Sequence, residues 1–278
     1  MMRSLWTAAS GMRAQQTNVD TIANNLANVN STGYKTQQAS FKSLLYQNLQ
    51  STSTNNAGED KPVSAEVGLG TRTAAITSRF TQGNLQPSES PFSMAIEGDG
   101  FFQVKNINDE TLYTRDGSFI LSPNGTGNML CTSDGYPVLD TMGNAIVLPA
   151  DRVATAVNIG QDGALSFPDE KGNHSPYMSA DGTYAVKIGI VQFNNPAGLE
   201  KAGGNAYKAT VASGAAIVED GAIGVKQSRI DQYYLEGSNV DVANEMVDLI
   251  VAQRAYELNS KAIQTSDTMM QQANNLRS

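Results

Sequence analysis

The chain has 278 residues, of which 40% are hydrophobic and 17% are charged, and its formal net charge is −8. A chain of this length can bury one or two sizeable hydrophobic cores. Its acidic balance and its lack of a cluster of lysines and arginines argue against nucleic acid as a partner. The lone cysteine, Cys131, excludes an intramolecular disulfide and any metal site made of several cysteines. It lies in a strand-like stretch, where we expect a small buried hydrophobe.

The N-terminal residues show no sign of a secretory signal peptide, since they contain neither an apolar core segment nor a cleavage site. No run of about 18 apolar residues occurs in the sequence either. We therefore expect no insertion into a membrane and no export by the general secretory route, and export by another machine is left open.

A helix with a weak hydrophobic seam is predicted near the N-terminus. Apolar residues recur every seven positions, with further apolar residues between them: Leu5, Met12, Val19 and Leu26, then Ala8 or Ala9, Ile22 and Val29. Gly33, after a run of small polar residues, is typical of a helix stop or a turn. Several asparagines lower the helix propensity of this segment, and an isolated helix of this quality is marginal in water. We therefore expect it to need a partner.

The middle of the chain changes character twice. Residues 47–66 are polar and show no periodicity, which indicates a long loop or an extended arm. Residues 67–235 carry the signals of strands and tight turns, with Asp-Gly pairs at 99–100, 116–117, 134–135, 162–163, 181–182 and 220–221. Such pairs supply the positive φ angles of two-residue hairpin turns. We therefore predict an all-β domain of many short antiparallel strands.

The C-terminal segment predicts a second, longer helix. Its apolar residues recur every seven positions at Val242, Leu249, Tyr256, Ile263 and Met270. Met246 occupies the companion position of this seam, which Gln253, Ser260 and Asp267 continue, so that the second half of the seam is polar. We place the start of the helix at Ser238–Asn239, with acidic residues in the first turns, where they suit the helix dipole.

The two terminal segments carry opposite net charges. Residues 1–45 have a net charge of +3, from Arg3, Arg13, Lys35 and Lys42 against Asp20. Residues 236–278 have a net charge of −3, from six acids against three bases. Charged faces are usually only solvated, but the matching seven-residue patterns favour pairing of the two helices. The pattern does not distinguish pairing within one chain from pairing between neighbours.

The sequence offers little for catalysis or for binding a cofactor or a metal. His174 is the only histidine and lies in a polar, turn-like stretch, where a surface position explains it. The glycines around Asp99 lead into a strand, whereas a phosphate-binding loop opens a helix. Carboxylates are plentiful, so the competing enzyme class is a glycoside hydrolase, which requires two buried, converging carboxylates. We predict no catalytic, cofactor-binding or metal-binding residues, and no enzymatic function.

Several stretches resemble, in order, the motifs of one protein family. Residues 22–35 read Ile-Ala-Asn-Asn-Leu-Ala-Asn-Val-Asn-Ser-Thr-Gly-Tyr-Lys, and residues 98–104 and 113–119 contain Gly-Asp-Gly-Phe-Phe and Arg-Asp-Gly-Ser-Phe. Residues 236–247 and 253–261 form a further motif near the other end of the chain. Together they resemble the two signatures and the central β domain of the flagellar rod and hook family. The resemblance spans nearly the whole chain.

The resemblance implies an α+β subunit of a tube. The terminal helices would form a coiled-coil-like core around a central export channel, with the C-terminal helix innermost, and the all-β domain would face outward. The implied domains are residues 1–46, 47–66, 67–235 and 236–278. The implied assembly-interface residues are Leu5, Met12, Val19, Ile22, Asn25, Leu26, Asn28, Gly33, Val242, Met246, Leu249, Tyr256, Ile263 and Met270.

The resemblance also implies partners and a location. The chain would form a helical homopolymer, contact proximal rod proteins and the hook protein, and pass through the flagellar type III export apparatus without a cleaved signal peptide. Surrounding ring proteins would be further partners. The polymer would be part of the basal-body rod that crosses the cell envelope and the periplasm, with no cofactor.

Within the family, the opening motif and two later stretches favour a subunit of the distal rod. These stretches are residues 3–12, 44–47 and 68–72. The polar residues 47–66 also lie where rod subunits have an extension that the hook lacks. Asp241 and Tyr34 stand where the family commonly has Asn and Phe. The alternatives are a proximal rod or hook subunit of the same family and, in a different class, a carbohydrate-active enzyme.

Overall fold

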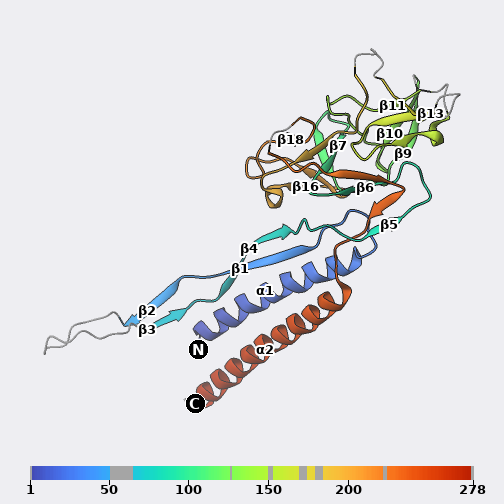
Figure 1. Ribbon diagram of the computed structural model, residues 1–278. Coiled ribbons are helices and arrows are strands. Elements are labelled where there is room, and N and C mark those ends of the chain that lie inside the picture. Colours follow the sequence, from blue (N-terminus) through green and yellow to red (C-terminus); the bar gives the residue numbers. More distant parts are fainter. Residues whose placement is uncertain are drawn as a thin grey trace. The chain divides into compact units, whose positions relative to one another are not determined.

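The computed structural model describes residues 2–50, 65–125, 127–149, 153–168, 174–178, 184–221 and 224–276. Its fold is α+β, as predicted, with one long helix near each end of the chain and many short strands between them (Figure 1). The strand pairs that it describes are antiparallel. Neither of its two long helices combines the length and the apolar character needed to cross a lipid bilayer.

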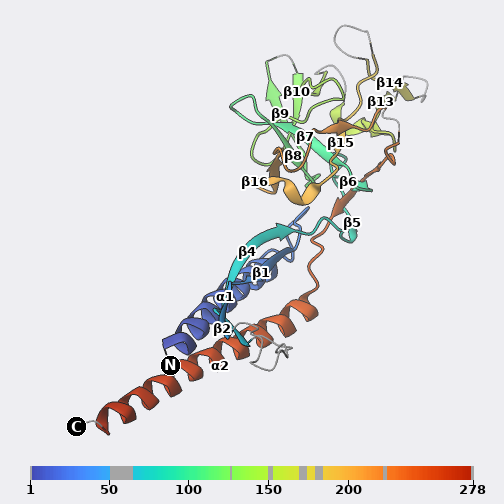
Figure 2. The ribbon, with the colours of Figure 1, turned by 90° about the vertical axis from the view of Figure 1, so that its left-hand side faces the viewer.

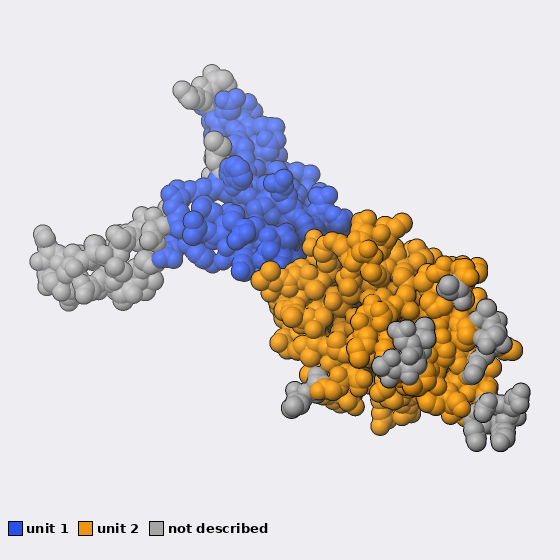
Figure 3. Space-filling model, turned by 90° about the horizontal axis from the view of Figure 1, so that it is seen from above, with its two compact units in different colours: residues 1–27, 37–78, 241–278 blue, residues 28–36, 79–240 orange. Residues whose placement is uncertain are grey.

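The chain divides into two compact units, coloured in Figure 3. Unit 1 comprises residues 1–27, 37–78 and 241–278, and unit 2 comprises residues 28–36 and 79–240. The chain therefore passes between the units four times, after residues 27, 36, 78 and 240. The expected ranges placed residues 1–46 in an N-terminal helix and turn and residues 67–235 in the β domain, whereas unit 1 includes residues 37–78 and unit 2 includes residues 28–36.

Unit 1 contains two helices and two-stranded ribbons. Helix α1 (Met2–Ala27) contacts α2 (Val242–Asn275) and also the ribbon formed by β1 (Gln37–Ser43) and β4 (Thr71–Ser78), and it lies between them (Figures 1 and 2). Strand β2 (Tyr46–Gln50) pairs with β3 (Ala65–Gly68). The predicted polar arm, residues 47–66, begins and ends in this second pair, and its residues 51–64 lie outside the described residues.

Both helix boundaries differ from the predicted ones. Helix α1 ends at Ala27, so Val29, expected in its seam, lies outside the helix. Helix α2 begins at Val242, after the predicted start at Ser238–Asn239. The reason is that the side chain of Asp241 caps the helix by accepting hydrogen bonds from the backbone N–H groups of the first turn.

Unit 2 is built from short strands around one main sheet. That sheet has six strands in the order β16 (Glu200–Gly203), β17 (Ala206–Lys208), β8 (Thr111–Thr114), β7 (Phe101–Lys105), β15 (Ile190–Gln192) and β18 (Ile217–Val218). Two sheets of three strands have the orders β11 (Val147–Leu148), β10 (Gly127–Cys131), β9 (Ile120–Asn124) and β12 (Asn158–Ile159), β13 (Leu165–Pro168), β14 (His174–Pro176). Two further pairs join β19 (Arg229–Gln232) to β6 (Met94–Glu97) and β20 (Tyr234–Glu236) to β5 (Leu85–Pro87). Short 3₁₀ turns cover Ala154–Ala156 and Pro196–Gly198.

The main sheet of unit 2 separates two hydrophobic clusters, because neighbouring residues of a strand point to opposite faces. Phe102 of β7 packs in the larger cluster, whereas its neighbour Phe101 packs with Tyr207 in the smaller one. Cys131 is buried at the end of β10, as predicted, and His174 is exposed in β14, as predicted. Unit 2 is therefore built around a sheet with one hydrophobic cluster on each of its two faces.

Candidate assembly interface

The contact between α1 and α2 is built largely from small and polar residues. On α2 it follows a row that recurs every seven residues, namely Glu245, Ala252, Asn259 and Ser266. Ala252 is only 1% exposed, and Ser4 Oγ lies 3.4 Å from Ser266 Oγ. A Cβ added at Gly11 would lie 3.0 Å from Asn259 Nδ2, so the absence of a side chain at Gly11 allows this approach. The two terminal helices therefore pair within one chain, through a close but weakly apolar seam.

The predicted apolar positions of the two helices differ in how far they are buried. Those of α1, Leu5, Met12, Val19 and Leu26, are partly buried, and Ile22 is buried. Those of α2 divide: Leu249, Ile263 and Met270 are partly buried, whereas Val242 and Tyr256 are 39% and 42% exposed. Outside the helices, Asn28 is partly buried and Gly33 is buried, both in unit 2.

The companion row of α2 is not the predicted one. Met246 is 51% exposed, and Gln253 and Asp267, expected to continue its row, are exposed as well, whereas Ser260 of the same row is partly buried. The row that faces α1 begins at Glu245, three residues after Val242. The predicted row began at Met246, four residues after Val242. The apolar character of Met246 suggested the wrong row, because the true row is small or polar throughout.

Asn25 connects three elements of unit 1. Its Oδ1 accepts a hydrogen bond from the backbone N–H of Gln37 at 2.9 Å, and its Nδ2 donates to the Gln37 carbonyl oxygen at 2.8 Å and to Glu245 Oε2 at 3.2 Å. One side chain of α1 thus binds the start of β1 and the first turns of α2. Burial raises the pKa of Glu245, the hydrogen bond from Asn25 opposes this rise, and Asp248 and Asp241 add to it.

A face of α2 beside the seam carries exposed apolar residues, which we call the outward stripe. Its members are between 54% and 89% exposed: Val247, Ile250, Val251, Leu258 and Met269 in α2, and Leu276 at the cap that follows the helix. Their spacing puts them on one side of a helix, since residues three, four and seven apart share a face. A soluble monomer rarely exposes a long contiguous apolar row, and such a row marks an interaction surface.

Unit 2 contains a buried ion cluster, made of Lys35, Arg115 and Glu236, whose side chains are 0%, 1% and 0% exposed. Lys35 Nζ donates to Glu236 Oε1 at 2.5 Å and to the carbonyl oxygen of Thr81 at 2.8 Å. The guanidinium of Arg115 donates to Glu236 Oε2 at 3.4 Å and to the Gly98 carbonyl oxygen at 2.8 Å. Burial lowers the pKa of Lys35, Glu236 acts in the opposite direction, and Arg115 adds to the lowering. A single carboxylate therefore serves two buried cations.

Asn239 joins the backbone segments beside this cluster. Its side-chain oxygen accepts from the N–H and the hydroxyl of Thr36, each at 2.7 Å, and its side-chain nitrogen donates to the carbonyl oxygens of Arg79 at 2.8 Å and Thr81 at 3.0 Å. Residues 36, 79 and 240 are the ends at which the chain enters or leaves unit 2. The side chain of Asn239 and the ion cluster therefore hold three of the four chain crossings at one place in unit 2.

The sequence did not indicate these roles. Lys35, Arg115 and Glu236 all lie in the motifs that carry the family resemblance, but their spacing does not reveal that they meet. One signal was available: Lys35 is the only charged residue between Asp20 and Lys42. A solitary lysine in an otherwise uncharged stretch is a candidate for burial with a partner.

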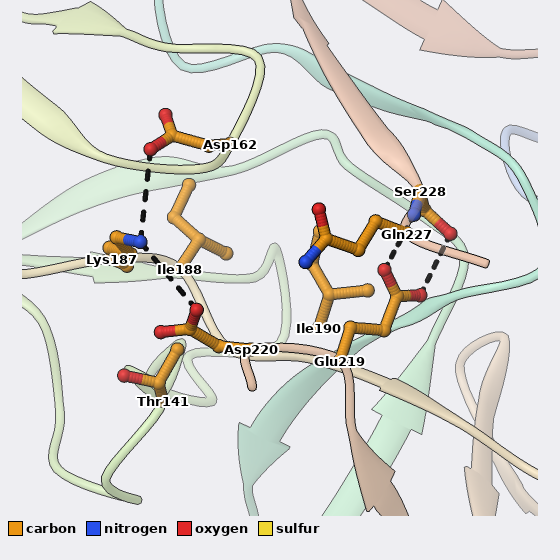
Figure 4. Close-up of a pocket in the computed structure, with 9 residues that line it drawn as sticks. All are labelled: Thr141, Asp162, Lys187, Ile188, Ile190, Glu219, Asp220, Gln227 and Ser228. Carbon is orange, nitrogen blue, oxygen red and sulfur yellow. Dashed lines mark hydrogen bonds and ion pairs between the residues drawn. The ribbon is translucent and has the colours of Figure 1, made fainter. Parts of the chain in front are cut away.

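A small pocket in unit 2 tests the competing reading as a carbohydrate-active enzyme (Figure 4). Its volume is about 90 Å³, whereas sites for small molecules usually have roughly 300–1,000 Å³. Lys187 Nζ lies 3.8 Å from Asp162 Oδ2 and 3.6 Å from Asp220 Oδ1. Glu219 accepts hydrogen bonds from the backbone N–H and the hydroxyl of Ser228. Each of these carboxylates thus has a structural partner, and the pocket is too small for a sugar ring.

Comparisons with known proteins match both ends and the middle of the chain. The family "Flagella basal body rod protein" matches residues 5–35, "Flagellar hook protein FlgE/F/G D1 domain" matches residues 95–167, and "Flagellar basal body rod FlgEFG protein C-terminal" matches residues 231–276. These ranges contain Lys35, Arg115 and Glu236, respectively, so each matched range supplies one member of the ion cluster.

Full-length relatives agree with these matches. The chain is 44% identical to the flagellar basal-body rod protein FlgG of Borreliella burgdorferi, over 100% of this chain and 99% of the relative. It is 43% identical to FlgG of Agrobacterium fabrum, over 96% and 97% of the two chains, and 38% identical to FlgG of Bacillus subtilis, over 100% of both. The chain therefore belongs to the flagellar rod and hook protein family and is a structural subunit of the flagellar basal-body rod.

Proposed function

We propose that the chain polymerises into the distal part of the rod, as a hollow helical tube that lines an export channel and transmits torque from the motor to the hook. The outward stripe of α2 is the observation that carries this proposal. Its members lie between Val247 and Leu258 and again at Met269 and Leu276, near the end of a helix of 34 residues, and they are exposed although α2 already contacts α1. A second copy of the chain is the partner that a homopolymer supplies.

The paired helices suit the core of such a tube. Their seam of small and polar residues brings α1 and α2 close together, whereas most of the large apolar side chains of α2 remain for contacts with neighbours. Contacts between two different surfaces of identical chains extend into a helical filament when the rotation between copies does not close into a ring. The predicted interface positions Val242, Met246 and Tyr256, which are exposed in the single chain, are then available to neighbouring subunits.

Unit 2 supports a role in transmitting torque. A torsional load on the terminal helices reaches unit 2 through its chain crossings, and the ion cluster with Asn239 binds three of these crossings by side-chain hydrogen bonds. Buried charged networks of this kind are costly to distort, because an unpaired buried charge is strongly unfavourable. We propose further that proximal rod proteins, the hook protein, surrounding ring proteins and the export apparatus are partners, as in the family.

One pair of variants tests the proposal. Val251→Asp introduces a charge into the outward stripe at a side chain that is 61% exposed, so the single chain should remain folded. Gln264→Asp introduces the same charge at an exposed position of α2 outside the stripe. The proposal expects the unaltered protein and Gln264→Asp to form tubes with a central channel in electron micrographs, and Val251→Asp to remain monomeric. Tubes of normal length from Val251→Asp would contradict the role of the stripe.

A further inference from the structure

Residues 28–36, which we call the strap, belong to unit 2 but form neither a helix nor a strand. The strap follows α1, which ends at residue 27, and leads into β1, which begins at residue 37. Both of these elements belong to unit 1, so the strap is a short excursion of the chain into unit 2. None of the strands that the structure describes includes a strap residue, so removal of the strap breaks no strand pair.

Polar contacts bind the strap to the rest of unit 2. The backbone N–H of Gly33 donates to the carbonyl oxygen of Glu236 at 2.8 Å. Asn205 Nδ2 donates to the carbonyl oxygen of Thr32, also at 2.8 Å. The last two strap residues add the hydrogen bonds to the ion cluster and to Asn239. Water replaces such partners when a segment leaves, so each of these bonds contributes only a small net free energy.

The hydrophobic interior of unit 2 is built without the strap. Among the described residues, neither of the two hydrophobic clusters includes a member of the strap. Tyr34, the one aromatic residue of the strap, is 5% exposed, and Lys201 Nζ lies 5.7 Å from the centre of its ring. Removal of the strap therefore opens neither cluster, whereas opening of the main sheet exposes both of them to water.

The charges of the buried ion cluster also permit the strap to leave. With the strap docked, the cluster holds two cations, Lys35 and Arg115, against the one carboxylate of Glu236. Lys35 is the member that belongs to the strap, so its departure leaves Arg115 and Glu236 as a pair of opposite charges. A buried charge that loses its partner is strongly unfavourable, and neither of these two charges does so.

We propose that the strap is a latch, which undocks from unit 2 as one piece while the main sheet and both hydrophobic clusters stay folded. Docked, it leaves no free chain between the last residue of α1 and unit 2. Undocked, its nine residues span up to about 30 Å. Undocking therefore lets α1 and β1 change position while unit 2 stays intact. The inference concerns the single chain and does not depend on the proposed polymerisation.

Native-state hydrogen exchange of the full chain tests the latch. The backbone N–H groups of Gly33 and Thr36 are hydrogen-bonded in the docked strap, and that of Gln103 in β7 is hydrogen-bonded in the main sheet. The proposal expects one common opening constant for Gly33 and Thr36, at least about threefold larger than that of Gln103. A smaller difference, or unequal constants for Gly33 and Thr36, would overturn the inference.

A mild core variant separates undocking from opening of the sheet. Ile146→Val shortens a side chain of the larger hydrophobic cluster that is 1% exposed. It should raise the opening constant at Gln103 by between about twofold and tenfold. The constants of Gly33 and Thr36 should stay unchanged, because undocking leaves this cluster closed. A parallel rise at all three positions would show that the strap opens only together with the sheet, and the inference would then be wrong.

The matched variant Gly33→Ala strains the docked strap itself. Gly33 has a φ of +65°, and an added Cβ would lie 2.6 Å from the backbone nitrogen of Asp116. Undocking and opening of the sheet both start from the docked state, so the constants of Thr36 and Gln103 should both rise, by about fivefold or more. Unchanged exchange at Thr36 would contradict the docked position of the strap and overturn the inference.

Discussion

Replacing Glu236 by Gln would test whether the buried ion cluster holds unit 2 together. The substitution keeps the size of the side chain and removes its charge. It leaves the ammonium of Lys35 and the guanidinium of Arg115 buried without the carboxylate that serves both of them. The backbone hydrogen bonds of the cluster, from Lys35 to Thr81 and from Arg115 to Gly98, remain available.

The expected effect is large because the side chains concerned are buried. Removing one partner of a buried ion pair costs about 3–5 kcal/mol, since the remaining charge has no compensation. Here two cations lose their shared anion, so we expect the loss of stability of unit 2 to lie at the upper end of this range. A tenfold change in an equilibrium constant corresponds to about 1.4 kcal/mol. Global opening of unit 2 should therefore become between about three and four orders of magnitude more frequent.

Native-state hydrogen exchange of β7, in the middle of the main sheet, measures this opening. The matched control is Glu110→Gln, which removes the carboxylate of the exposed pair between Lys208 and Glu110. Exposed pairs contribute little, so its exchange should match that of the unaltered protein. If Glu236→Gln also left the exchange of β7 unchanged, the cluster would not stabilise unit 2 and its proposed part in transmitting torque would be wrong.

Two further substitutions have clear expected outcomes. Because burial raises the pKa of Glu245 above the ordinary 4.5, the paired helices should be most stable at acid pH and lose stability as pH rises through the folded-state pKa. Glu245→Gln should remove this dependence in helix melts followed by circular dichroism, unlike Glu257→Gln on the exposed side of α2. Gly33→Ala should destabilise unit 2 by more than about 1 kcal/mol in urea titrations, because Gly33 has a φ of +65° and a Cβ there would lie 2.6 Å from the Asp116 nitrogen. Gly125→Ala, where nothing lies within 4 Å of an added Cβ, should be nearly neutral.

The periodic parts of the sequence were predicted well, because helix and strand periods follow from backbone geometry alone. Both terminal helices were expected, and so was their partnership, from the repeated apolar positions and the opposite charges. The sequence did not predict which row of α2 faces α1. A seam of Glu245, Ala252 and Ser266 carries no hydrophobic signal, so the more apolar neighbour at Met246 was chosen in its place.

The glycines show a second limit of sequence reasoning. Asp-Gly pairs were taken as hairpin turns, and Gly135, Gly163 and Gly221 do have positive φ angles. Gly117 has another purpose, since a Cβ there would collide with the Met94 carbonyl oxygen. A glycine required by close packing between segments distant in sequence can produce the same Asp-Gly dipeptide as a hairpin turn. For the same reason the ion cluster was missed, since its members come from three separate stretches of the chain.

In the single chain, α2 buries little of its apolar surface. A helix is normally stabilised by burying its apolar face, yet the face of α2 that packs on α1 has Ala252 as its one buried residue among those described. Each large apolar side chain removed from water contributes roughly 1.5–3 kcal/mol. In the polymer proposed above, a neighbouring subunit supplies the surface that buries the six members of the outward stripe, and this burial adds the stabilisation that α2 lacks in the single chain. This proposal predicts that the stability of α2 and the growth of the rod depend on the same contacts.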